Sequence, residues 1–171
     1  MIRNEAVAGQ FYPGTKNSLL REIESLIDSR AARSDAVGVV SPHAGYAYSG
    51  SVAGSVLSHV SMKDDYIIMG PNHTGLGEPF SIDTSDAWKT PMGDIALNGV
   101  LREALLSSSR IFRADRLAHL HEHSIEVQLP FLQVLAGLQV RADSRRIDGY
   151  RRTAPGGDRY RQDCEVAGPF G

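Results

Sequence analysis

Two histidines follow two short apolar runs in the same way, and this repetition is the most informative feature of the chain. Residues 37–40 run directly into Ser-Pro-His43, and residues 66–69 run into Gly-Pro-Asn-His73. Neutral imidazole is the commonest protein metal ligand, and it also transfers protons near neutral pH. The pattern therefore indicates a metal site or an acid/base pocket that contains both histidines.

The two apolar runs predict how these histidines come together. Short buried strands separated by a segment of helical length are typical of a β-α-β unit. We expect 37–40 and 66–69 to be parallel strands, with His43 and His73 at their carboxyl ends, where open α/β sheets bind ligands. Each histidine alone could simply form a hydrogen bond at a strand end, but the repeated arrangement favours a functional role for the pair.

A third cluster, residues 119–126, presents three histidines and two glutamates directly before an apolar segment. If the cluster is extended, the alternate histidines share one face; if it is helical, His119 lies beside Glu122 or His123. The spacing does not choose between these conformations. The glutamates could orient an imidazole, and Glu122 or Ser124 could instead cap the helix that follows.

Apolar spacing predicts the elements that position these groups. A helix with one apolar face precedes the first strand, and a second helix, with small residues between its valines, crosses over between the two strands. The last helix is apolar on more than one face, which predicts burial, and Pro130 limits the regularity of its first turns. The expected helices are 18–27, 51–60, 98–106 and 124–138, with a strand at 79–84 and a loop at 88–93.

The composition is that of a globular protein and excludes several classes of function. The chain has 171 residues, 42% hydrophobic and 22% charged, with a net charge of -2, which fits one domain and offers no field to attract nucleic acid. No apolar run approaches the ~20 residues of a membrane-spanning helix, so no membrane partner is expected. A single cysteine, Cys164, cannot form an internal disulfide, and the N-terminus lacks a secretion signal, so we expect a cytoplasmic protein.

The composition changes abruptly near the C-terminus. Residues 141–171 contain seven arginines, no lysine and no leucine, and neither a helical nor a strand period is present. Too few apolar side chains are available there to offset the entropy of ordering the backbone. We expect an arginine-rich tail from about residue 139 that is disordered or comes from a shifted reading frame.

Five motifs in succession resemble the Memo family, also called the MEMO1 family. They are the segments 6–13, 42–50, 70–73, 88–93 and 122–131, which contain both Pro-to-His motifs and the sequence Glu-His-Ser-Ile-Glu. The resemblance covers about residues 1–138. Glu5 departs from it, because a proline is usual at that position.

The resemblance implies a fold and a site. Memo proteins are similar to class III extradiol (LigB-like) dioxygenases, which implies an α/β three-layer sandwich around a central, mostly parallel sheet. His43 and His73 occupy the positions of two metal ligands, and His123 lines the same cleft, where it can act as an acid or base. The expected ion is Fe²⁺, with Cu or Zn as alternatives, and the expected activity of the complete form is that of a non-haem oxidoreductase.

The resemblance also implies that part of the family fold is missing. The third ligand of the family comes from a C-terminal motif of Ser-Ser-Asp type, which this chain lacks. We therefore expect an N-terminal portion that is inactive by itself and whose uncovered strand edges favour a homodimer. The alternatives are a module that binds a peptide or phosphopeptide without catalysis, and a truncated product without function.

Overall fold

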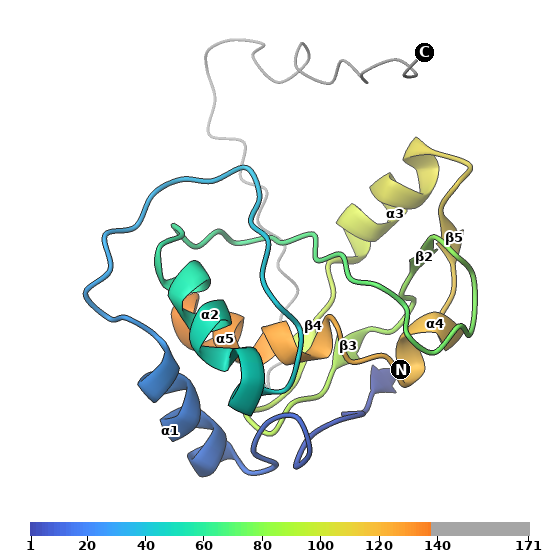
Figure 1. Cartoon of the computed structure of the whole chain (residues 1–171). Coiled ribbons are helices and arrows are strands. Elements are labelled where there is room, and N and C mark those ends of the chain that lie inside the picture. The colour runs from blue at the N-terminus through green and yellow to red at the C-terminus, as the bar shows by residue number, and fades with distance from the viewer. Residues whose placement is uncertain (138–171) are drawn as a thin grey trace, which may run out of the picture. The chain divides into compact units, whose positions relative to one another are not determined.

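The computed structural model describes residues 1–137 of the chain. This part contains both helices and short strands, which is compatible with the α/β class (Figure 1). The helical elements are α1 (Lys16–Leu26), α2 (Tyr46–Ser58), α3 (Gly99–Ser108), α4 (Leu117–Leu120), the 3-10 turn η1 (Glu126–Gln128) and α5 (Leu129–Leu135). The strands are β1 (Ile2–Arg3), β2 (Ser81–Ile82), β3 (Ala87–Trp88), β4 (Ile95–Ala96) and β5 (Arg113–Ala114).

The strands form two small sheets in the described residues. In one, β3 lies between β1, to which it is parallel, and β4, to which it is antiparallel. In the other, β2 pairs with β5 in parallel. A single central sheet of a three-layer sandwich is not formed within residues 1–137, so that finer description of the fold remains a prediction.

The segments 37–40 and 66–69 are not strands, which corrects our prediction of two parallel strands. A parallel bridge joins Ser34 to Val60 just before these segments, but it does not continue into a ladder. Val40 is 92% exposed and Met69 is 89% exposed. Their apolar character suggested burial, yet a strand forms only when a partner supplies backbone hydrogen bonds, and local sequence does not reveal that partner.

The helices agree better with the sequence. The helices expected at 18–27 and 98–106 form as α1 and α3, and the crossover helix forms as α2 but begins earlier, at Tyr46. The segment expected as one helix over 124–138 is divided into η1 and α5, with Pro130 in the first turn of α5. Proline fits that first turn because it has no N–H to donate.

The core that supports the site lies where α1, α2 and α5 pack against one another (Figure 1). Leu19 and Ile23 of α1 and Phe131 of α5 are completely buried there. Gly54 of α2 lies directly against the backbone of Leu26, which leaves no room for a side chain. Burial of these apolar groups is the main force that fixes α2, and with it the loop that carries His43. No helix in the described part has both the length and the apolar character to span a membrane.

Candidate metal centre

Three imidazoles from separate parts of the chain converge. His43 precedes α2, His73 follows the segment 66–69, and His123 precedes η1. The ring centroids of His43 and His73 are 5.3 Å apart with planes inclined by 49°, and those of His43 and His123 are 6.1 Å apart. The His73 and His123 rings are stacked at 4.5 Å with an inclination of 21°. The predicted proximity of His43 and His73 is therefore present in the structure.

These imidazoles border an open pocket of about 790 Å³. Phe11 forms part of its wall and packs against the His123 ring at 4.7 Å, and Tyr48, which is 88% exposed, lies at its edge. The pocket is lined by Gln10, Phe11, Pro42, His43, Ala44, Gly45, Tyr48, His73 and His123. Such a pocket can admit a small molecule or the side chain of a peptide.

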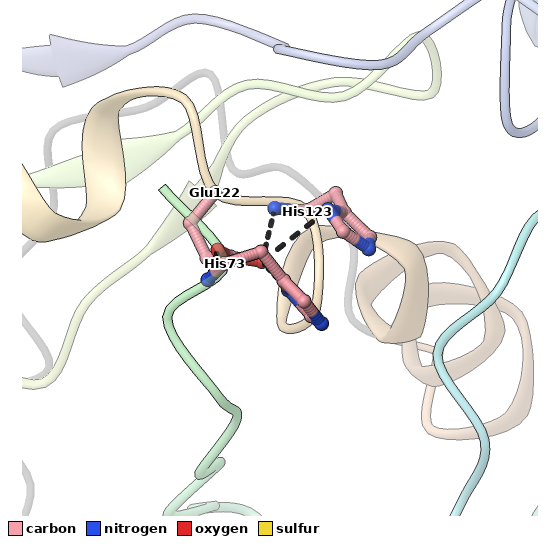
Figure 2. Close-up of side chains that lie close together, drawn as sticks. All are labelled: His73, Glu122 and His123. Atoms are coloured by element: carbon pink, nitrogen blue, oxygen red, sulfur yellow. Dashed lines mark hydrogen bonds and ion pairs between the residues drawn. The ribbon is translucent and has the colours of Figure 1, made fainter. Parts of the chain in front are cut away.

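Glu122 holds the His73 ring, as Figure 2 shows. Its Oε1 lies 2.9 Å from His73 Nδ1, and its Oε2 accepts the backbone N–H of His73 at 2.5 Å. Burial alone raises the pKa of the Glu122 carboxyl, but hydrogen bonds from His73 and from the backbone N–H groups of Ser124, His73 and His123 lower that pKa to about 2. Glu122 is therefore an ionised carboxylate at neutral pH and can only accept hydrogen bonds.

His123 remains neutral beside the other two imidazoles. Burial lowers the pKa of His123 below its ordinary value, and the charges of His73 and His43 lower it further, while Glu122 acts in the opposite direction. His73, Glu122 and His123 offer potential ligand atoms that all lie within 4.8 Å of one another. The pocket is thus lined by three imidazoles, which are ligands suited to a transition-metal ion, and the Glu122 carboxylate lies beside two of them.

Two side chains form hydrogen bonds to the backbone close to His43 and His73. Gln128 donates to the Pro42 carbonyl at 2.8 Å, next to His43, and its Oε1 accepts from Ser41 at 2.9 Å. Ser124 donates to the Pro71 carbonyl at 2.8 Å. The segment 122–128 therefore holds in place both the loop that carries His43 and the loop that carries His73. Sequence reasoning missed Gln128 and Phe11, because nothing in their local pattern shows that they lie beside a histidine distant in sequence.

The other two histidines of the 119–126 cluster lie elsewhere. His119 Nε2 lies 3.0 Å from Ser81 Oγ, and its ring meets the edge of Trp88, while His121 is exposed. The segment is neither extended nor a continuous helix, because α4 ends at Leu120 and a turn follows. Only His123 of this cluster reaches the pocket.

Most of this chain is similar to proteins of one known family. The family model described as Memo-like protein matches residues 3–147. A MEMO1 family protein of Methanosarcina barkeri is 47% identical over 133 residues, covering 77% of this chain and 49% of that protein. A MEMO1 family protein of Thermotoga neapolitana is 44% identical over 152 residues, covering 80% and 55%, and one of Aquifex aeolicus is 43% identical over 133 residues, covering 77% and 49%. The chain spans about half the length of these relatives.

Proposed function

This chain belongs to the Memo-like protein family, and from that premise we propose that it binds a metal ion through His43 and His73. The supporting observation is the geometry of these two rings, whose centroids are 5.3 Å apart and whose planes are inclined by 49°. The lone pair of an imidazole nitrogen lies in the ring plane. Two planes inclined in this way can intersect at a common point, so both nitrogens can face one ion.

His123 has a different role in this proposal. Its ring is stacked on His73 with an inclination of only 21°, so the lone pairs of these two rings run side by side rather than toward one point. We assign His123 to proton transfer with a molecule bound in the pocket, not to metal coordination. Its neutral state at physiological pH leaves one nitrogen free to accept a proton.

The donor set fits the ions that the family resemblance suggests. Imidazole suits Fe, Cu and Zn, and two protein ligands leave several coordination positions open. We propose Fe²⁺ first, with Cu or Zn as alternatives. Bound Fe²⁺ would supply redox chemistry, so the complete family fold would be an oxidoreductase of LigB-like type. Two ligands alone hold an ion weakly, so we expect this chain to bind metal but to have impaired activity.

Metal content tests the proposal. The purified chain is dialysed to equilibrium against Fe²⁺, Cu²⁺ or Zn²⁺ in separate experiments, and its metal content is measured by elemental mass spectrometry, together with that of a His43→Ala/His73→Ala double variant. His121→Ala is the matched control, because His121 is exposed and lies outside the pocket. We expect the double variant to lose the ion that the wild type and the control retain. Equal metal content in all three proteins would refute the proposal.

The assignment of His123 is tested separately. We expect His123→Ala to retain the metal stoichiometry of the wild type, because the ion is held by His43 and His73. Loss of the ion in His123→Ala would make His123 a ligand and would contradict a role limited to proton transfer.

A second candidate function is a module that binds a peptide or phosphopeptide without catalysis. The open pocket between Phe11 and the exposed Tyr48 favours it, because aromatic side chains of this kind often form peptide-binding surfaces. A peptide library screened with and without chelator separates the two candidates. Peptide binding that is lost in Tyr48→Ala but unaffected by chelator would support the module, and absence of any peptide bound would refute it.

A further inference from the structure

Glu122 could play either of two parts at this site. It lies close enough to His73 and His123 to be a metal ligand itself, since the potential ligand atoms of the three residues lie within 4.8 Å of one another. It could instead hold an imidazole in place for the ion, as carboxylates often do beside metal-binding histidines. The hydrogen bonds of its two oxygens distinguish these roles.

Both oxygens of Glu122 are already engaged. Oε1 lies 2.9 Å from His73 Nδ1, and it accepts from the His123 backbone N–H at 2.8 Å and from the Ser124 backbone N–H at 2.9 Å. Oε2 accepts the His73 backbone N–H at 2.5 Å. The Glu122 residue is only 4% exposed, so a turn of the carboxylate toward an ion would leave buried N–H groups unsatisfied.

The same contacts determine the tautomer of His73. Oε1 already accepts two backbone N–H groups, so it has no proton to donate, and its 2.9 Å contact with His73 Nδ1 requires that nitrogen to carry the proton. The other nitrogen, Nε2, then carries a free lone pair. The His73 side chain is 45% exposed, and its ring lines the pocket.

We propose that Glu122 is a positioning residue that fixes the His73 ring with Nδ1 protonated and Nε2 free, and is not itself a metal ligand. The role of the ring toward an ion rests on the proposed function above, whereas the tautomer does not. A carboxylate that holds the other nitrogen of a metal-binding histidine in this way fixes the orientation of the ring toward the ion.

The first test measures the tautomer without any metal. Long-range ¹H–¹⁵N spectra of the metal-free wild type distinguish the two ring nitrogens of His73. We expect the signature of a proton on Nδ1 in the wild type and a mixture of tautomers in Glu122→Gln, whose amide can donate as well as accept. A wild-type His73 with its proton on Nε2 would overturn the proposal, and this measurement stands even if the variant does not fold.

The second test measures metal affinity in Glu122→Gln and Glu122→Asp. We expect the affinity to fall about 10- to 100-fold in Glu122→Gln with unchanged stoichiometry, and Glu122→Asp, which keeps the charge, to recover part of it. Glu78→Gln is the control, because Glu78 is exposed and outside the pocket. Unchanged affinity in Glu122→Gln would overturn the positioning role. A wild type that binds no ion but has Nδ1 protonated would refute only the proposed function.

Discussion

Glu126 shows how a single buried side chain can organise a site that it does not enter. It forms an ion pair with Arg3 at 2.5 Å, and both side chains are completely buried. It also accepts from the Tyr12 hydroxyl at 2.6 Å and from the backbone of Ala6 and Val7. These contacts fix the N-terminal segment against the turn before α5. Phe11 is thereby held beside His123, although the two are distant in sequence.

His119, which lies outside the pocket, predicts how stability depends on pH. Burial lowers the pKa of His119 below its ordinary 6.5, although Asp83 and Asp115 oppose this effect. Below pH 6.5 the unfolded chain binds a proton that the folded protein resists, so folding should weaken as the pH falls from that value. Urea unfolding between about pH 8 and about pH 5 should show a larger loss of stability in the wild type than in His119→Gln.

The variant isolates His119 because carboxylates titrate equally in both proteins. His59→Gln is a suitable control, since His59 is exposed at the end of α2. An identical pH dependence for the wild type and His119→Gln would show that burial of His119 does not contribute.

At the scale of elements, the contact between α1 and α2 depends on Gly54. A methyl group at this position would meet the Leu26 carbonyl, which belongs to the backbone and cannot turn away. Alanine favours a helix over glycine by roughly 1 kcal/mol, but overpacking of this kind costs about 1–3 kcal/mol, so we expect Gly54→Ala to be destabilised. Gly38→Ala is the control, because no heavy atom lies within 4 Å of its added methyl group. Equal urea midpoints for both variants would contradict the close approach of the helices.

The sequence predicted those elements whose apolar pattern lies within the element itself. The apolar face of 18–27 predicted α1, because a 3.6-residue period is contained within the helix itself. The prediction of strands at 37–40 and 66–69 was wrong, because a strand needs a partner strand that its own residues do not specify. Pro130 indicated that the first turns of the helix expected at 124–138 would be irregular. It did not predict that this segment would divide into η1 and α5.

The site was predictable in part for the same reason. His43 and His73 were recognised because each follows an apolar run and a proline, a signal carried by adjacent residues. The role of Glu122 remained one of several alternatives, because its contact with His73 joins residues that are far apart in the chain. Gln128 lies within the motif 122–131, but that motif does not show its hydrogen bonds to Ser41 and Pro42, which are far away in the chain.

At the scale of the whole molecule, the segment 66–69 has one half-buried side and one exposed side. Tyr66 and Ile68 pack against the core, whereas Ile67 is 56% exposed and Met69 is 89% exposed. Val40 in the other apolar segment is 92% exposed. Both segments therefore present large apolar side chains to solvent, and exposed apolar patches tend to associate with other chains.

We therefore expect the chain to self-associate through these segments, and Val40→Lys/Met69→Lys to weaken that association. Burial of one large apolar side chain contributes about 1.5–3 kcal/mol, so loss of two such contacts should raise the dissociation constant at least about 100-fold. Sedimentation velocity over a concentration series measures this change. Val100→Lys on α3 adds one such charge at a side chain that is 83% exposed, and it should leave the association unchanged. A wild type that stays monomeric throughout, or an equal effect of Val100→Lys, would show that these two segments are not the associating surface.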